Sequence, residues 1–373
     1  NRGLRKAVYT PFLQSVPRQY VIDDKACIHF SEEACQKCLE DCKKHAIDFT
    51  QVVEEETVHV ESIIAATGVK PWDPTGLYGY GDPRFPDVIT SMELERMMSP
   101  EGPTKGAVIR PSTGEPPMSV AMIQCVGSRS EKEGELSYCS KLCCPNSVKN
   151  TVLLKEHFPE LEIFVFHNGI RTSGNRQEKL FLEARKQGVV FVNCFPDVTE
   201  GHVLPFSDPL LGQDRLLRKA FDLVVLAVGI VPTAADMSRL LGVPLGKRGF
   251  VKEDNQLSPT STPTKGIYFA GAVGSPADIK QCIEQAGSAA SEVAKHFQKD
   301  TAELSLIIAK VDLEKCTGCG NCLDICPNEA ITMVEIPEIT PKPGEKNERP
   351  QIDYGRCCFC GLCVDVCPPG SLR

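Results

Sequence analysis

The segment Cys316-Thr-Gly-Cys319-Gly-Asn-Cys322-Leu-Asp-Ile-Cys326-Pro327 recurs near the end of the chain as Cys357-Cys-Phe-Cys360-Gly-Leu-Cys363-Val-Asp-Val-Cys367-Pro368. Both segments have the spacing of a two-cluster bacterial ferredoxin, in which the fourth cysteine of each run ligates the cluster of the other run. The spacing therefore predicts two [4Fe–4S] cubes, one held by Cys316, Cys319, Cys322 and Cys367 and the other by Cys357, Cys360, Cys363 and Cys326. Zinc is the less favoured interpretation, because zinc sites usually combine two widely separated cysteine pairs.

The composition favours metal ligation over disulfide bonds. The chain has 373 residues, of which 19 are cysteine, and a net charge of −8. An odd number of cysteines suits a disulfide framework poorly, and we expect a reducing, cytoplasmic location. No apolar run approaches the roughly 18–20 residues that a membrane span needs, and the acidic balance argues against nucleic acid as a partner.

A second cysteine run, Cys27-x7-Cys35-x2-Cys38-x3-Cys42, keeps two short ferredoxin spacings but has a longer first gap. Lys43 also stands where a proline usually follows the fourth cysteine. The run predicts a single [4Fe–4S] cube, with a zinc knuckle as the alternative.

The middle of the chain alternates strand signals with helix signals. Strands are expected at 119–124, 161–167, 189–193 and 221–228, and helices at about 146–157 and 176–187. This alternation predicts a doubly wound α/β domain with a parallel sheet. An earlier apolar run, which ends at Gly68, predicts a further buried strand.

A third cysteine set lies in this α/β region. Cys125 directly follows a strand signal, and Cys139, Cys143 and Cys144 stand just before the next helix. A dinucleotide-binding domain would carry G-x-G-x-x-G at this junction. Because cysteines replace the glycines, and a helix N-terminus can stabilise thiolates, we interpret the four as ligands of a further cluster. The alternative is that they are buried structural cysteines.

The three remaining cysteines are Cys194, Cys282 and Cys358. We expect the first two to pack in the interior, because free cysteine behaves as a small apolar residue. No role is assigned to Cys358.

Three segments are typical of a flavin-binding disulfide-reductase fold. They are Ala66-Thr67-Gly68, Gly229-x2-Pro232 and Gly271-Ala272. Each alone is also explained by turn chemistry, and it is their order and separation that favour a flavin. No G-x-G-x-x-G for the ADP half of FAD occurs in the chain, so a preceding segment or another chain would supply it, or FAD does not bind.

A long helix is expected from about residue 276, and its start is expected to face the flavin through Asp278, Ile279 and Gln285. Its apolar residues recur with a period close to 3.6, which predicts that one face is buried. That face carries Ile279, Ile283, Ala286, Ala290, Val293 and Phe297.

Together, these residues resemble the HdrA-like family, the A subunits of heterodisulfide reductases. The resemblance rests on the cysteine runs and on Asn1-Arg-Gly-Leu-Arg-Lys-Ala7, Ile123-Gln-Cys-Val-Gly-Ser-Arg129, Tyr138-Cys-Ser-Lys-Leu-Cys-Cys144, Gly271-Ala272 and Pro276-Ala-Asp-Ile279. It implies FAD with clusters on either side, four [4Fe–4S] clusters in total, and Lys149 near the flavin ring. It also implies partner subunits that deliver and remove electrons.

The resemblance implies a thioredoxin-reductase-like (disulfide-reductase-like) α/β fold in several parts. Residues 1–20 and 53–118 would form part of a flavin-binding domain, and 21–52 an inserted single-cluster unit. Residues 119–235 would form a nucleotide-domain-like region that carries a cluster. Residues 236–300 would complete the flavin-binding domain, and 301–373 would form a two-cluster ferredoxin domain.

The first hypothesis for function is an electron-transfer subunit that takes part in flavin-based electron bifurcation. The implied partners are heterodisulfide reductase B- and C-like subunits, a hydrogenase or dehydrogenase electron donor, and ferredoxin, in a hetero-oligomer. One alternative is an iron–sulfur electron wire without flavin. Another is an NAD(P)H-dependent flavoprotein reductase, which the missing glycine loop after Gln124 disfavours.

Overall fold

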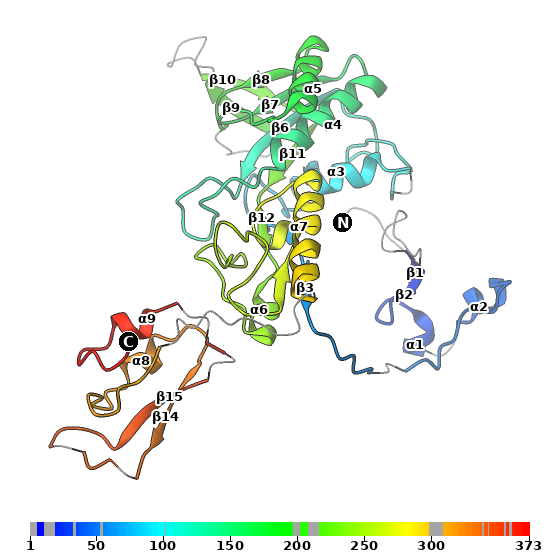
Figure 1. The fold of residues 1–373 in the computed structure, drawn as a ribbon. Helices are drawn as coiled ribbons and strands as arrows, with labels where there is room; N and C mark the ends of the chain where they lie inside the picture. Colours follow the sequence, from blue (N-terminus) through cyan, green and yellow to red (C-terminus); the bar gives the residue numbers. More distant parts are fainter. Residues whose placement is uncertain are drawn as a thin grey trace. The chain divides into compact units, whose positions relative to one another are not determined.

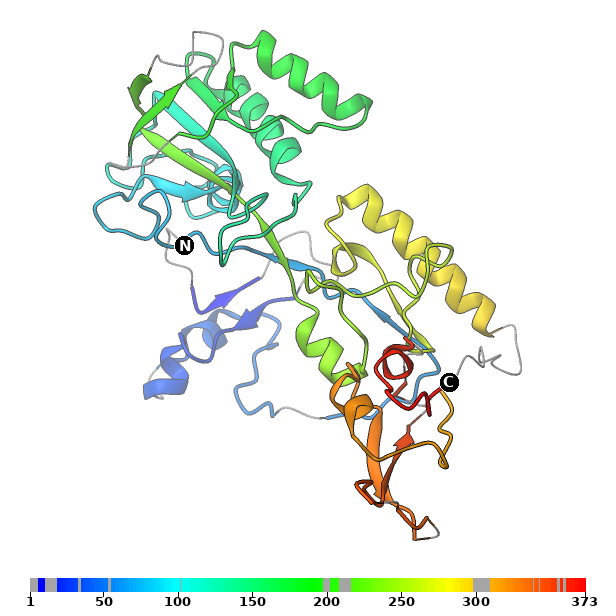
Figure 2. The same cartoon turned by 90° about the vertical axis from the view of Figure 1, so that its left-hand side faces the viewer.

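The computed structural model describes residues 6–10, 19–32, 35–52, 55–100, 102–196, 202–207, 216–297, 309–337, 339–341, 343–353, 356–357 and 360–373. They fall into two compact units (Figures 1 and 2). The first unit comprises 1–58, 73–138 and 143–229, and the second comprises 59–72, 139–142 and 230–373. Both units are therefore assembled from segments that are separated in the sequence.

In the first unit, the helices and strands that the structure describes are β1 (Val8–Tyr9), β2 (Val21–Ile22), α1 (Ile28–Glu32), α2 (Lys37–Asp41), β5 (Val88–Thr90), α3 (Ser91–Met98), β6 (Ser119–Val126), α4 (Cys143–His157), β7 (Glu162–Phe166), α5 (Asn175–Lys186), β8 (Val190–Val192), β9 (Val203–Ser207), β10 (Leu216–Ala220) and β11 (Leu223–Val228). In the second unit they are β3 (Ile63–Ala65), β4 (Val69–Pro71), β12 (Ile230–Pro232), α6 (Ala235–Leu241), β13 (Ile267–Phe269), the 3-10 helix η2 (Gly271–Val273), α7 (Ile279–Phe297), α8 (Asn321–Asp324), β14 (Ile331–Glu335), β15 (Glu348–Ile352) and α9 (Leu362–Asp365).

The core of the first unit is a five-stranded parallel sheet with strand order β5-β11-β6-β7-β8. All six residues of β11, Leu-Val-Val-Leu-Ala-Val, are buried, as expected of a strand that is covered on both faces. The predicted parallel α/β sheet is confirmed.

The two faces of this sheet are covered differently. On one face, Ile163 and Val165 of β7 share an apolar core with residues of α3, α4 and α5. Because side chains alternate along a strand, Phe164 and Phe166 point to the other face. There they meet Phe206 of β9, and the β9–β10 hairpin, which the sequence did not predict, covers this side.

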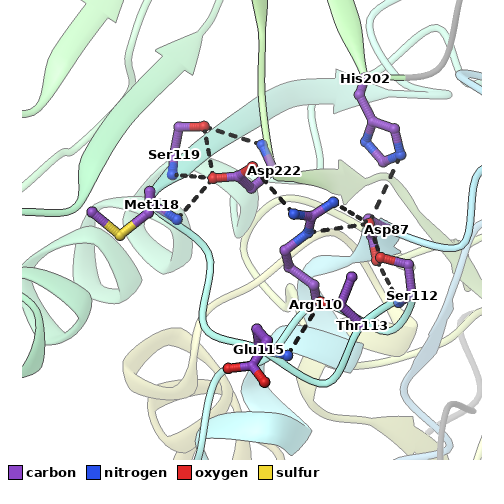
Figure 3. Close-up of polar contacts among 9 residues, drawn as sticks. All are labelled: Asp87, Arg110, Ser112, Thr113, Glu115, Met118, Ser119, His202 and Asp222. Carbon is purple, nitrogen blue, oxygen red and sulfur yellow. Dashed lines mark hydrogen bonds and ion pairs between the residues drawn. The ribbon is translucent and has the colours of Figure 1, made fainter.

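A polar network ties together the amino ends of three neighbouring strands (Figure 3). Asp87, which precedes β5, is almost fully buried and accepts hydrogen bonds from the backbone and hydroxyl of Ser112 at 2.7 and 2.6 Å. Arg110 forms ion pairs with Asp87 at 3.3 Å and with Asp222 at 3.5 Å. Asp222 precedes β11 and accepts from the backbone N–H of Ser119, the first residue of β6, at 3.1 Å. The network therefore fixes the relative position of β5, β11 and β6.

In the second unit, β3 and β13 form a parallel pair and β4 and β12 an antiparallel pair. Helix α7 packs against β13 and η2 through a face that includes Ala289, which is fully buried. The prediction that its more apolar face is buried is wrong for the described residues, since Ile279 is 81% exposed and Ile283 68% exposed. Periodicity revealed the apolar stripe, but of its residues Val293 packs against the buried Tyr268, Ala270 and Ala289, whereas Ile279 and Ile283 stay exposed. Within the part of the chain that the structure describes, no helix is long and apolar enough to cross a membrane.

The Asp87 network predicts a pH-dependent stability. Nε2 of His202 lies 3.9 Å from the Asp87 carboxylate, and burial holds the pKa of His202 below its ordinary value. The unfolded chain then binds more protons than the folded chain, so this contribution is complete above about pH 6.5 and is lost as the pH falls. We expect the melting temperature, followed by circular dichroism under anaerobic conditions, to fall less between pH 7 and pH 5 in H202Q than in the wild type. An equal fall in both proteins would contradict this role of His202.

Candidate iron–sulfur and flavin sites

Two apolar cavities in the C-terminal part of the second unit are lined by cysteines of both ferredoxin-type runs. The cavity of ≈ 80 Å³ is lined by Cys326 of the first run together with Cys357, Cys360 and Cys363 of the second. The cavity of ≈ 10 Å³ is lined by Cys316, Cys319 and Cys322 of the first run together with Cys367 of the second. Each grouping is the set that the crossed-ligand rule predicts for one cube. The individual ligand assignments stay predictions, which this geometry supports.

The chain after the fourth cysteine of each run turns a backbone N–H back towards the sulfur. The N–H of Ala330 donates to Sγ of Cys326 at 3.3 Å, and the N–H of Ser371 donates to Sγ of Cys367 at the same distance. The turns place Glu329 (φ 49°) and Gly370 (φ 61°) in the left-handed region. Hydrogen bonds of this kind stabilise a sulfur that carries negative charge, as a cluster ligand does.

Two other thiols, those of Cys322 and Cys363, have pKa values that burial raises, so they are not charged without a metal. Burial raises the pKa of Cys322 to about 11 and also raises the pKa of Cys363, the corresponding cysteine of the second run. Without a metal both are protonated near neutral pH, and metal ligation would displace these protons.

Tight packing fixes the loop between Cys316 and Cys319. A Cβ at Gly318 (φ 70°) would lie 2.6 Å from the carbonyl oxygen of Glu348.

The run Cys27–Cys42 ends in the same turn. The N–H of Ala46 donates to Sγ of Cys42 at 3.4 Å, and His45, one residue before it, has a φ of 50°. Hydrogen bonds from backbone N–H groups, that of Ala46 first, lower the pKa of the Cys42 thiol. The absence of proline after this cysteine therefore does not prevent the ferredoxin-type turn.

The rest of this run surrounds two short helices. Cys27 is buried just before α1, Cys38 lies on α2 and Cys42 follows α2. Nδ1 of His29 is hydrogen-bonded to the carbonyl of Cys35 at 3.1 Å, and the His29 ring stacks on Phe49 with centroids 3.8 Å apart. These contacts hold together a segment that has few apolar residues.

Three cysteines of the third set lie at the end of β6 and the start of α4. Cys125 lies near the end of β6, and Cys143 and Cys144 are the first two residues of α4. Sγ of Cys143 donates to the carbonyl of Val228, the last residue of the neighbouring strand β11, at 3.3 Å. Cys139 falls in the second compact unit, where the Lys141 N–H donates to its sulfur at 3.4 Å. Ligation of one cluster by all four cysteines stays a prediction.

The segments expected to contact a flavin meet at one edge of the β3–β13 pair. Ala66-Thr67-Gly68 follows β3, and Gly271-Ala272 follows β13 within η2, where Gly271 has a φ of 77°. Thr233, just after β12, donates through its hydroxyl to the carbonyls of Thr67 and Gly68 at 2.8 and 3.0 Å. The carboxyl end of parallel strands is the usual place for a cofactor.

A cavity of ≈ 310 Å³ lies beside the first half of α7. It is lined mainly by polar residues: Lys141, Pro259, Thr260, Ser275, Gln281, Glu284, Gln285 and Ser288. Asp278 caps α7 by accepting from the N–H of Gln281 at 2.8 Å. Oε1 of Gln285 is buried and has no hydrogen-bond partner in the described structure, so it is an acceptor that a bound N–H group would satisfy. This combination fits a flavin ring.

Other predicted flavin residues lie elsewhere or contact protein groups. Lys149 lies on α4 in the first unit and forms an ion pair with Glu95 of α3. Ile279 is the first residue of α7 and is exposed, and Pro232 ends β12. A Cβ at Gly229 would lie 2.9 Å from the Leu136 side chain, so this glycine permits close packing against the loop after Cys125. None of the flavin assignments is tested by this placement.

Sequence reasoning missed two features of these sites. Arg129 was seen only as part of a motif, although its guanidinium lies beside the Cys125 sulfur. Lys141, Thr260 and Ser288 were not connected with the α7 cavity. Of these three residues, only Lys141 had a feature in the sequence that pointed to a site, because it lies between Cys139 and Cys143.

Among the residues whose placement is described, no group of three or more His, Cys, Asp or Glu side chains is arranged to hold a single metal ion.

The C-terminal fold and cavities define the class of protein: an iron–sulfur protein with a two-cluster ferredoxin domain. A family described as "4Fe-4S dicluster domain" matches residues 315–371, which confirms this part of the predicted fold and the presence of 4Fe–4S chemistry.

The resemblance to the A subunits of heterodisulfide reductases is confirmed as homology over most of this chain. The A subunit of the H(2):CoB-CoM heterodisulfide,ferredoxin reductase of Methanothermobacter marburgensis is 39% identical over 89% of this chain and 51% of its own length. The iron–sulfur A subunit of the CoB–CoM heterodisulfide reductase of Methanocaldococcus jannaschii is also 39% identical to this chain. The match covers 89% of this chain and 51% of that subunit. The chain thus spans about half the length of the curated relatives it matches.

Among solved structures, the thioredoxin reductase of T. acidophilum is similar to 66% of this chain and 68% of its own chain, with 14% identity and a TM-score of 0.39.

The two ferredoxin-type cavities predict which cysteine substitutions affect the same cluster. In the anaerobically purified protein, C326S and C363S should alter the same EPR signal, because both side chains line one cavity. C322S and C367S should alter the other signal. If C326S instead altered the signal that C322S alters, each run would hold its own cube and the crossed assignment would be wrong.

Proposed function

We propose that this chain is the electron-transferring part of an oxidoreductase component similar to the A subunits of heterodisulfide reductases. It moves single electrons through four [4Fe–4S] clusters and a flavin. The partners are B- and C-like subunits, an electron-donating hydrogenase or dehydrogenase, and ferredoxin, in a cytoplasmic hetero-oligomer. The flavin site splits electron pairs between acceptors of high and low potential.

The observation that carries this proposal is the grouping of eight cysteines around two cavities of the ferredoxin domain. Two cubes in one small domain provide a path for single electrons between a docked partner and the rest of the chain. One ligand at each cavity, Cys319 and Cys360, is exposed, so each cube would have a sulfur at the protein surface.

The chain's own residues prepare these sites. Backbone N–H groups point at the sulfurs of Cys42, Cys326 and Cys367, which stabilises the added negative charge of a reduced cube. Apolar residues of β14 and β15, Ile331 and Ile352, line the larger cavity and limit the access of water. Hydrogen bonding and burial are the two means by which a protein tunes cluster potentials.

The flavin part of the proposal rests on the cavity beside α7. FAD, when bound, supplies the exchange between two-electron and one-electron chemistry. Gln285 would accept a hydrogen bond from the ring, and the carboxyl ends of β3 and β13 would contact it through backbone. Bifurcation is proposed because the name of the Methanothermobacter marburgensis relative pairs a heterodisulfide with ferredoxin.

The third cluster is tested by C143S in the anaerobically purified native complex. We expect the iron content to fall by about one cube, roughly four iron atoms, with loss of one EPR signal while the other signals persist. The matched control is C194S, which should keep all iron because Cys194 lies outside the three sets. Unchanged iron in C143S would remove the third cluster from the proposal.

The flavin site is tested by Q285M. Loss of one hydrogen bond should weaken FAD binding about fivefold, measured by fluorescence during titration of the deflavinated complex. The matched control is Q187M, since Oε1 of Gln187 is likewise buried without a partner but lies on the first unit. Equal FAD affinity in Q285M and the wild type would contradict the placement of the ring beside α7.

A further inference from the structure

Arg129 lies against the sulfur of Cys125. Its Nη1 atom is 3.9 Å from Sγ of Cys125 and donates to the carbonyl of Asn168 at 2.5 Å. Asn168 follows β7, the strand next to β6 in the sheet. The guanidinium is therefore held between the carboxyl ends of two neighbouring strands. Its Nη1 atom contacts both the carbonyl of Asn168 and the sulfur of Cys125.

The loop that carries Arg129 is fixed by backbone hydrogen bonds. The N–H of Ser128 donates to the carbonyl of Cys125 at 3.0 Å, and the N–H of Arg129 donates to the carbonyl of Tyr138 at 3.1 Å. The N–H of Leu136 donates to Gly127 at 3.0 Å. Cys125 and Arg129 also have φ values of 57° and 56°, a left-handed conformation that is unfavourable for residues with a Cβ. Such strain is retained where it serves to place a functional group.

Within the described residues, Arg129 has no carboxylate partner within ion-pair distance. In the ranges for which the structure gives side chains, Arg129 has hydrogen bonds to Cys125 and Asn168 and no ion pair with a carboxylate. Both Arg129 and Cys125 are half-buried, so solvent screens the charge less than at an exposed site. A positively charged group therefore lies 3.9 Å from the Cys125 sulfur at a partly buried position.

Two other cysteines of the set, Cys139 and Cys143, make contacts with neutral backbone groups. Sγ of Cys143 is directed at the carbonyl of Val228, and Sγ of Cys139 accepts from the backbone of Lys141. Among these contacts, only that of Arg129 brings a formal positive charge to a ligand sulfur. A hydrogen bond from a charged donor is about twice as strong as a neutral one.

We propose that Arg129 raises the reduction potential of the cluster held by the Cys125 set, and so sets the direction in which electrons pass between this cluster and its neighbours. The proposal rests on the proposed function, because it requires that this cluster exists. On reduction the cluster gains one electron from a one-electron donor, no bond is formed or broken, and the added negative charge is stabilised by the guanidinium. Arg129 acts through Cys125 and is a positioning and tuning residue.

The test is an EPR-monitored redox titration of the anaerobically purified native complex with dithionite as reductant. The signal of this cluster is first identified as the one that C143S lacks. In R129Q we expect that signal to titrate at a more negative potential than in the wild type, with unchanged iron content and unchanged potentials for the other clusters. R129K, which keeps the charge but not the planar guanidinium, should give an intermediate value. The control is R185Q, because Arg185 lies on α5 with its guanidinium over the ring of Phe181.

An unchanged potential in R129Q with intact iron would overturn the proposal. If C143S lacks no signal, the proposed cluster itself is absent, and the two failures are thereby distinguished. If R129Q does not retain the cluster, pulsed EPR of the reduced wild-type complex labelled with guanidinium-¹⁵N arginine decides the matter. A weak ¹⁵N coupling to the signal absent from C143S supports the proposal, and its absence overturns it.

Discussion

The cysteine sites depend on one backbone constraint: N–H groups must point at sulfurs that carry negative charge. The described residues include seven non-glycine positions with positive φ. Five of them are a cysteine of the three sets or lie within four residues of one: His45, Cys125, Arg129, Lys141 and Glu329. After Cys42 and after Cys326, this conformation turns the following N–H onto the sulfur. Strain in these turns is compensated when the sulfur is a charged ligand, which makes the local conformation and the cofactor interdependent.

The parallel sheet separates structural from chemical roles. At its amino edge, Asp87, Arg110 and Asp222 form a satisfied polar network that joins β5, β11 and β6. At its carboxyl edge, Cys125 and Cys143 stand where a nucleotide-binding domain places its phosphate loop. The first edge fixes strand positions so that the second can hold strained residues and half-buried sulfur. The polar network resists changes in strand register. Such changes would move Cys125 and Cys143 relative to each other.

Sequence reasoning succeeded where the chemistry is local. Ligand spacing within twelve residues sufficed for the ferredoxin domain, and alternating apolar runs sufficed for the parallel sheet. It failed for contacts between residues that are far apart in the sequence. The contact of Asp222 with Met118 spans 104 residues and leaves no local pattern. The apolar stripe of α7 was read correctly as a stripe, but the sequence of a helix does not say which element covers it. Similarly, the order of residues after Cys144 could not reveal that Lys149 pairs with Glu95.

The central claim is that all three cysteine sets hold cubes, and Mössbauer spectroscopy tests it most directly. The native complex would be grown on ⁵⁷Fe, purified without oxygen, and its iron related to the amount of this chain. About sixteen iron atoms per chain, all with the parameters of [4Fe–4S] cubes, are expected. About eight iron atoms per chain would contradict the claim, because only the C-terminal ferredoxin domain would then carry clusters.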